Sequence, residues 1–204
     1  MQISCSIQPI AEYGHHERAI DAMNIPTQKE CYGLIQEMGM MDHIVAHSEQ
    51  VCRVAVCLSE KLRSQGIDLN LELIRASALL HDITKTRSFS TRENHAETGG
   101  EFLQKRGFRE VGRVIRQHVK LDTYVASGNP VEAEIVNYAD KRVLHDQIVL
   151  LADRLSYILE RYGEGMQSRE RIMGLWAKSI ELEKKIFNCL PFLPELLKIE
   201  VEKN

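Results

Sequence analysis

The chain has 204 residues, of which 44% are hydrophobic and 27% charged, a composition typical of one globular domain. Its formal net charge of −3 and isoelectric point of about 6.3 argue against nonspecific nucleic-acid binding, which usually requires a basic face. No signal-peptide pattern and no apolar run of membrane-spanning length are evident, and the five cysteines form no C-x-x-C pair. We therefore expect a soluble cytoplasmic protein with reduced cysteines and no membrane partner.

The N-terminal part of the chain predicts an arm followed by a folded domain. Residues 1–26 show no clear period and end at Pro26, so we interpret them as an N-terminal arm. Thr27 and Glu30 then have the spacing of a capping box, in which each side chain bonds the other residue's backbone N–H. We place the domain at residues 27–190.

Two helices are expected next. Residues 42–64 begin at a capping candidate, Asp42, and carry apolar residues at helical spacing. Residues 70–82 begin at Asn70 and are apolar nearly all round. A helix of that kind belongs at the centre of a core.

The remainder of the chain also favours helices. Residues 84–92 are polar and are expected to form a loop, and residues 121–129 form a connector. Residues 191–204, which begin with two prolines in close succession, are expected to form a charged C-terminal tail. Further helices are expected over residues 93–106, 109–119, 130–160 and 168–188, with a bend after Asp140 in the third of them. Because no convincing strand or repeat is found, the sequence predicts an all-α fold, a single-domain helical bundle.

A series of imidazole and carboxylate side chains lies in or beside these helices. Its members are His47, His81, Asp82, His95, His118 and Asp140. Such ligands without thiolates suit a divalent transition metal better than a structural zinc site. Six candidates exceed what one metal needs when water and substrate must also bind, so the leading hypothesis is a two-metal hydrolytic centre.

The chain contains two His-Asp dipeptides, and their contexts differ. His81-Asp82 ends the strongly apolar helix, where a polar pair costs several kcal/mol unless it is paired or bound to metal. His145-Asp146 lies in a mixed polar stretch, so we interpret it as exposed or as lying behind the metal ligands.

A similar choice applies to His43 and His47, which share a helical face and could chelate one metal together. His43 lies in the fraying first turn, so we favour His47 and place His43 in solvent or at the rim of a pocket. His95 and His118 each have a structural explanation near a helix end, and only the joint order of the series indicates metal binding.

Two adjacent glycines follow His95 within its helix. Gly99 and Gly100 cost roughly 1 kcal/mol each relative to alanine inside a helix. We expect them where another backbone packs closely.

The assembled order resembles the HD-domain superfamily of metal-dependent phosphohydrolases, whose pattern is H…HD…H…H…D. Residues 78–85 (Ala-Leu-Leu-His-Asp-Ile-Thr-Lys) are similar to the family's central signature. Residues 95–103 resemble the helix that carries its third histidine, and residues 137–141 its closing aspartate. The resemblance covers residues 40–160. Thr84 departs from the glycine common at that position, and the absence of a G-Y-P motif argues against cyclic di-GMP as a substrate.

The resemblance implies a metal set formed by His47, His81, Asp82 and Asp140. By the same resemblance, His95 and His118 complete a second site. The cofactors would be two divalent transition metal ions, drawn from Fe, Mn, Co, Ni and Zn.

Within this set, Asp82 would bridge the two metals, and a metal-activated hydroxide would attack phosphorus. Lys85 is the best candidate to neutralise a phosphoryl oxygen, and Lys141 is second. Solvated surface charges remain the alternative interpretation of both lysines.

The sequence thus favours an enzyme that cleaves a phosphoester or phosphoanhydride of a small molecule, with a nucleotide as the expected substrate. A single-metal nucleotidase is the nearest variant. A non-catalytic nucleotide-sensing or interaction module with the same fold is the alternative from another class. The acidic balance argues against a nucleic-acid phosphodiesterase.

Overall fold

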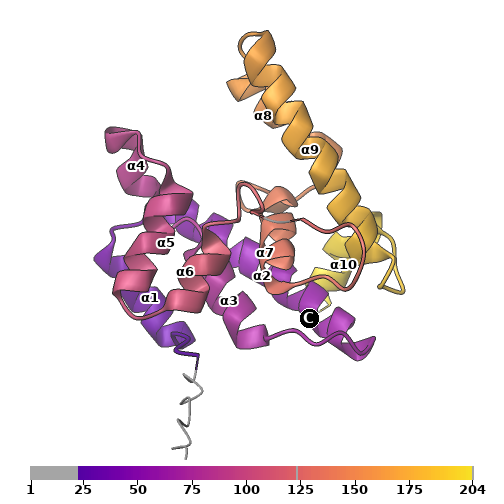
Figure 1. The fold of residues 1–204 in the computed structure, drawn as a ribbon, viewed down its shortest axis with the longest axis horizontal. Helices are drawn as coiled ribbons and strands as arrows, with labels where there is room; N and C mark the ends of the chain where they lie inside the picture. Colours follow the sequence, from indigo (N-terminus) through magenta and orange to yellow (C-terminus); the bar gives the residue numbers. More distant parts are fainter. Residues whose placement is uncertain (1–22, 123, 204) are drawn as a thin grey trace, which may run out of the picture.

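The structure is a computed structural model that describes residues 23–122 and 124–203, and within them helices predominate (Figure 1). The helices of the first two thirds are α1 (Gln28–Glu37), α2 (Asp42–Ser64), α3 (Leu71–Leu80), α4 (Lys85–Thr91), α5 (His95–Lys105), α6 (Arg109–Ile115) and α7 (Glu132–Lys141). They are followed by β1 (Val143–Leu144), β2 (Gln147–Ile148), α8 (Leu151–Tyr162), α9 (Met166–Phe187), η1 (Pro194–Leu196) and α10 (Leu197–Glu202). The prediction of an all-α fold is confirmed.

The core forms around α3, as its apolar composition predicts. Seven of the ten residues of α3 are buried, and the helix packs against α1, α2, α6 and α7. Its N-terminus is capped by Asn70, whose side chain accepts from the Leu73 N–H at 3.0 Å. The capping box of α1 is also present, with Thr27 and Glu30 each bonding the other's backbone N–H. Asp42 differs slightly from expectation, because it is the first residue of α2 and Met41 is the cap.

Close backbone contact between α5 and α6 explains the glycines that follow His95. A Cβ at Gly100 would lie 2.8 Å from the Gly112 carbonyl oxygen, and one at Gly112 would lie 2.5 Å from the Gly100 oxygen. A Cβ at Gly99 would meet Ile83 and Ile115 side chains at 3.2 and 3.3 Å. The expected close approach is confirmed, and it brings the start of α5 beside the end of α6.

Two expectations about local structure were wrong. Residues 84–92, expected as a loop, contain helix α4, which is short and buries none of its residues, so no apolar period reveals it. The helix expected over residues 130–160 is interrupted after α7 by the antiparallel pair β1–β2. His145 occupies the turn with a φ of 54°, a left-handed conformation that non-glycine residues adopt only occasionally. Neither glycine nor proline therefore marks the break in the sequence.

The C-terminal residues also differ from the expected tail. Residues 194–202 form η1 and α10, and α10 packs against α2. Leu197 and Val201, one helical turn apart, are buried, which explains why this charged segment folds. Glu200 adds an ion pair to Lys61 of α2 at 3.1 Å. The expected N-terminal arm lies mostly in residues 1–22, outside the described residues.

Helices α8 and α9 form a hairpin whose far end extends away from the remaining helices (Figure 1). The other end of α9 is anchored to α7 by Lys185, whose Nζ donates to both carboxylate oxygens of Glu134 at 2.8 Å. In residues 23–122 and 124–203, no helix is both long and apolar enough to cross a membrane. Within the same ranges the cysteines are free thiols.

Candidate metal centre

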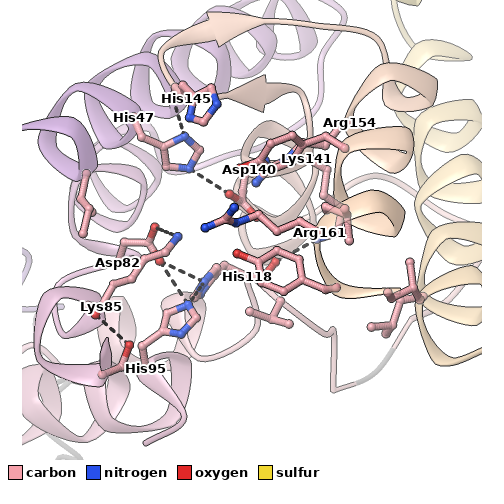
Figure 2. A pocket seen from close by; sticks show the side chains of 18 of the residues that line it. His47, Asp82, Lys85, His95, His118, Asp140, Lys141, His145, Arg154 and Arg161 are labelled. Atoms are coloured by element: carbon pink, nitrogen blue, oxygen red, sulfur yellow. Dashed lines mark hydrogen bonds and ion pairs between the residues drawn. The ribbon is translucent and has the colours of Figure 1, made fainter. Parts of the chain in front are cut away.

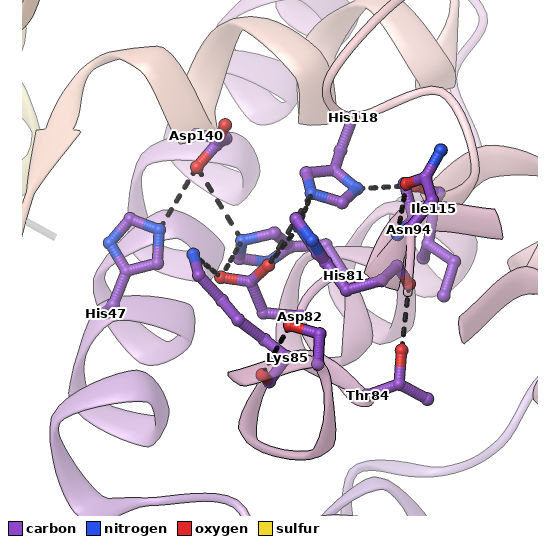
Figure 3. Close-up of polar contacts among 12 residues, drawn as sticks. His47, His81, Asp82, Thr84, Lys85, Asn94, Ile115, His118 and Asp140 are labelled. Carbon is purple, nitrogen blue, oxygen red and sulfur yellow. Dashed lines mark hydrogen bonds and ion pairs between the residues drawn. The ribbon is translucent and has the colours of Figure 1, made fainter. Parts of the chain in front are cut away.

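The fold brings all six predicted ligands to one place, between α2, α3, α5, α6 and α7 (Figures 2 and 3). His47 lies in α2, and His81-Asp82 directly follows α3. The remaining ligands are His95 at the first position of α5, His118 in the turn after α6, and Asp140 near the end of α7. These residues are as much as 93 positions apart along the chain, so tertiary packing alone assembles them.

The first group of ligands lies around Asp140. His47 Nε2 is 3.1 Å from Asp140 Oδ1, and His81 Nε2 is 3.7 Å from the same oxygen. His81 Nε2 is also 3.3 Å from Asp82 Oδ2. His47, His81 and Asp82 have donor atoms close enough together to hold one metal ion.

The second group lies on the other side of Asp82. Its Oδ1 atom is 3.2 Å from His95 Nε2 and 3.5 Å from His118 Nε2. The two histidine Nε2 atoms are 3.1 Å apart. These three residues form a second potential metal site. Asp82 therefore belongs to both groups and turns one carboxylate oxygen toward each.

Backbone carbonyls fix the tautomers of three of the histidines. The Nδ1–H of His47 donates to the His145 oxygen at 2.8 Å, that of His81 to the Ala78 oxygen at 2.8 Å, and that of His118 to the Ile115 oxygen at 2.6 Å. A carbonyl oxygen only accepts, so the proton must lie on Nδ1. In a neutral ring the lone pair then lies on Nε2, which faces the centre, the arrangement that metal-binding histidines use.

Two buried polar atoms at the centre have no hydrogen-bond partner, as expected at a site that binds a metal ion. Among the described residues, His81 Nε2 and Asp82 Oδ1 are buried without a hydrogen-bond partner. Leaving such atoms unpaired costs about 1–3 kcal/mol each, and more for a charged group. A divalent cation would satisfy both, and imidazole and carboxylate donors suit a transition metal. The residues therefore fit the expected cofactor.

The charges of the centre also favour a cation. Burial by itself would raise the pKa of Asp82, but the neighbouring His81 and Lys85 charges hold it well below its usual range. Burial is likewise outweighed at Asp140, where the His47 hydrogen bond and the His81 charge lower the pKa. Burial lowers the pKa of His118, which keeps that ring neutral. Burial is also outweighed at His81, where the Asp82 charge raises the pKa, so a proton on this ring takes the place that a cation would occupy beside two ionised carboxylates.

The two predicted lysines have different surroundings. Lys85 Nζ lies 2.6 Å from Asp82 Oδ2, and its side chain lines the pocket in front of the centre. Lys141 Nζ donates to the carbonyl oxygens of His118 and Asn137 and to Asn137 Oδ1, at 2.9, 3.2 and 2.9 Å. Its three protons are thus already used within the protein. This geometry favours Lys85 for contact with a substrate and gives Lys141 the task of holding His118.

Sequence reasoning missed the roles of Asn137 and Thr84 in this support. Asn137 Nδ2 donates to the carbonyl oxygens of Gln117 and His118 at 2.7 and 3.0 Å. Thr84 is fully buried and its hydroxyl donates to the His95 carbonyl oxygen at 2.9 Å. The threonine that departs from the family's glycine thus links the His81-Asp82 turn to α5. Only the family motifs that contain them pointed to these positions.

The centre opens into a cavity of about 670 Å³ (Figure 2). His43 lines it and is exposed, as expected for a residue at the rim. The His145 backbone supports His47, which matches the expectation that the second His-Asp pair lies behind the ligands. The far wall comes from α8 and α9, through residues that the sequence did not single out: Arg154, Tyr157, Ile158, Arg161, Tyr162, Ile172, Leu175 and Trp176.

Comparison with known proteins gives one family and several relatives. The family described as HD domain matches residues 44–158. A tRNA (cytidine(56)-2′-O)-methyltransferase from Picrophilus torridus is 28% identical over 151 residues, which are 68% of this chain and 41% of that protein. Ribonuclease Y from Fusobacterium nucleatum is 28% identical over 133 residues, 61% of this chain and 24% of that protein. The chain therefore spans less than half the length of both relatives.

A solved structure is also similar to this chain. It is the crystal structure of a protein described as a predicted HD superfamily hydrolase, from an uncultured Thermotogales bacterium. The similarity has a TM-score of 0.45 and 22% identity, and it covers 80% of this chain and 93% of that chain.

Proposed function

The chain belongs to the HD domain family, and from this we propose that it hydrolyses a phosphoester or phosphoanhydride of a small molecule, with a nucleotide as the leading candidate. The observation that carries the proposal is Asp82, which lies between two histidine groups and turns an oxygen to each. A carboxylate in that position would be a ligand shared by both groups, and the metals held there would supply charge for phosphate-ester hydrolysis, as in binuclear phosphatases. We propose two metals per chain.

The ligand types support a transition metal rather than magnesium. His47, His81, Asp82 and Asp140 would hold one ion, and Asp82, His95 and His118 the other. Four imidazoles and two carboxylates suit Fe, Mn, Co, Ni or Zn. When bound, the metals would supply positive charge that holds a phosphoryl group and lowers the pKa of water.

The protein's own residues would orient the phosphoryl group. In this structure Lys85 Nζ forms an ion pair with Asp82 Oδ2 at 2.6 Å. Because its side chain is partly exposed to the cavity, its ammonium can reach a phosphoryl oxygen that enters there. Asp82 and Asp140 lie within the ligand groups, so neither is available as a protein nucleophile, and we propose direct attack by water.

The test combines metal analysis with a substrate screen. Purified protein should contain two transition-metal ions per chain by elemental analysis. It should release phosphate from at least one nucleotide when loaded with Mn, Co or Ni, and a chelator should abolish the release. Saturation at one metal would replace the two-metal centre by the single-metal variant.

A non-catalytic sensing module remains the alternative from another class. Such a module needs none of the metal ligands, yet all six are present and converge. Metal-loaded protein that binds nucleotides but hydrolyses no phosphate ester would favour the module over the enzyme.

A second hydrolytic candidate is cleavage of an RNA phosphodiester. The observation that favours it is the relative named Ribonuclease Y, whereas the net charge of −3 argues against a broad nucleic-acid face. A short oligoribonucleotide included in the screen distinguishes the two. Methyl transfer is not proposed, because the match covers 41% of the relative with that name and the histidine–carboxylate centre suits metal-assisted hydrolysis.

A further inference from the structure

One face of α8 is turned toward the metal centre. Arg154, Tyr157, Ile158 and Arg161 have the spacing i, i+3, i+4 and i+7, which places them on one side of a helix. All four line the cavity that contains Asp82 and the histidines. In Figure 2 the two arginines enter the same cavity as the metal ligands. Arg154 and Arg161 are seven residues, and so roughly 10 Å, apart along the helix axis.

Arg154 has no ion-pair partner among the described residues. Its Nε atom is buried without a hydrogen-bond partner among the described residues, and no carboxylate there forms an ion pair with its guanidinium. Arg106, Arg116 and Arg142, by contrast, each pair with a carboxylate. A partly buried, unpaired guanidinium is costly, so its position favours a negatively charged ligand.

Charge elsewhere in the cavity gives the same indication. The acidic residues that line it are Asp82 and Asp140, both already assigned to the metals. Lys85 lies on the side of the metal centre, and the two arginines lie on α8. A ligand in the cavity therefore meets positive charge both from the side of the metal centre and from α8.

The other residues that α8 and α9 contribute to the cavity are mainly apolar and aromatic. Tyr157 packs edge-on against the His145 ring, with a centroid distance of 5.5 Å, and the Arg154 guanidinium lies 5.9 Å from its centroid. Ile172, Leu175 and Trp176 extend the wall from α9. A flat aromatic ring, such as a nucleobase, could stack against such a surface. A volume of about 670 Å³ falls within the range of small-molecule sites and far exceeds the needs of a lone phosphate.

We propose that α8 and α9 form the substrate-recognition wall, in which Arg154 and Arg161 bind an anionic group other than the one held at the metals. The substrate class is then a nucleotide with at least two phosphates. This inference rests on the proposed function, because it takes one phosphoryl group to lie at the metal centre.

The protein contains its own reporter for a binding test. Trp176 is the single tryptophan of the chain and lines the cavity, so its fluorescence should respond when a ligand fills the site. Metal-loaded protein is titrated with α,β-methylene-ADP, AMP and adenosine, and calorimetry provides an independent Kd. Phosphate release is measured in parallel to correct for turnover. The two-phosphate analogue should bind at least about tenfold more tightly than AMP, as expected for added charge-assisted hydrogen bonds.

Matched variants separate recognition from general charge. Arg154→Ala should raise the Kd of the two-phosphate analogue about tenfold and the Kd of AMP less than about twofold. Metal content should be unchanged. Arg161→Ala should also raise the Kd of the two-phosphate analogue. Arg154→Lys should bind the analogue more tightly than Arg154→Ala does. Arg169→Ala, which removes an exposed arginine of α9 outside the cavity, should leave both Kd values unchanged. Far-ultraviolet circular dichroism verifies that each variant is folded.

Three outcomes would overturn the inference. Equal affinity of wild-type protein for the three ligands would mean that no second anion is recognised. Equal loss for the analogue and AMP in Arg154→Ala would assign that arginine to the phosphate at the metals. Unchanged affinity for the analogue in both Arg154→Ala and Arg161→Ala would mean that these arginines do not recognise the substrate. Because binding is read without turnover, an Arg154-dependent preference without hydrolysis would contradict the proposed function alone, and hydrolysis without that preference would contradict this inference alone.

Discussion

The helices that hold the metal ligands and the α8–α9 hairpin that faces them are packed very differently. Seven of the ten residues of α3 are buried, as are seven of the ten residues of α7. In α8, Leu151 is the sole buried residue of twelve. Exposed apolar side chains lie on the hairpin, including Tyr162, Met166 and Met173.

Under the proposed function, the buried helices hold the metal centre and the more exposed hairpin forms the substrate-recognition wall. Metal ligands must be held within a fraction of an ångström, which requires rigid, buried support. A wall that shapes a pocket can tolerate more movement, and a region with few buried contacts opens at lower free energy than a core. We therefore expect substitutions in the ligand-bearing helices to affect metal, fold and activity, and matched substitutions in the hairpin to leave metal and fold intact.

The largest effect is expected for Asp82→Ala. This change removes the shared carboxylate of both ligand groups, so metal content and phosphate release should fall together. Loss of an outer partner alone often costs 10- to 100-fold, and we expect more than about 100-fold in activity. Elemental analysis and the phosphate-release assay measure the two quantities.

The control is His145→Ala, in the turn between β1 and β2. Its ring packs on Tyr157 of α8, while its backbone carbonyl, which supports His47, is retained. Metal content should stay at the wild-type level. Comparable metal loss in the two variants would mean that His81-Asp82 is not the essential pair.

The next effect concerns the number of metals. His95→Ala and His118→Ala each remove one imidazole from the second group and leave the first untouched. Occupancy should fall from two ions per chain toward one, with a steep loss of hydrolysis and normal helicity by circular dichroism. Either variant with two ions and normal turnover would disprove the two-metal proposal.

A smaller effect is expected for Gly100→Ala. Its Cβ would lie 2.8 Å from the Gly112 carbonyl oxygen, so α5 and α6 must separate, at a cost of about 1–3 kcal/mol in the free energy of unfolding. The matched change in the hairpin is Gly174→Ala, whose Cβ meets nothing within 4 Å. That change should stabilise by up to about 1 kcal/mol through helix propensity. Urea unfolding measures both free energies. Equal destabilisation by the two changes would contradict the proposed difference in packing between the two regions.

The smallest effect is expected for Thr84→Val, which deletes the hydroxyl that donates to the His95 carbonyl oxygen. The loss should be about 1 kcal/mol, the typical net contribution of one hydrogen bond. Ser156→Ala removes a comparable bond in α8, from an exposed hydroxyl to the Ala152 carbonyl oxygen. Water replaces that bond, so the melting temperature should hardly change. A larger loss in Ser156→Ala would contradict the comparison.

Much of the fold could be predicted because helix signals are local. The Thr27–Glu30 box, the Asn70 cap and the apolar period of α3 each lie within a few residues of sequence. The break after α7 could not be predicted, since the turn at His145 adopts a positive φ without glycine. Helix α10 was missed because its charged residues mask the two buried side chains, Leu197 and Val201.

The metal ligands could be proposed from their order, because each stands in a recognisable family motif. The groups that orient these ligands could not be predicted, since the carbonyl partners of His47 and His118 depend on tertiary packing and on local turns. Arg154 and Arg161 could not be identified either. On a sequence they are ordinary surface charges of an amphipathic helix, and only the direction in which α8 faces distinguishes them.

The short β1–β2 hairpin has a consequence for engineering. Its His145 carbonyl fixes His47, and α8 begins three residues after β2 ends. A chimera that keeps residues 143–149 and the Lys185–Glu134 anchor can therefore exchange residues 150–175 for the matching segment of another protein. The graft should carry its own ligand preference while the metal-ligand residues stay unaltered, so β1–β2 marks where this chain could be cut and rejoined.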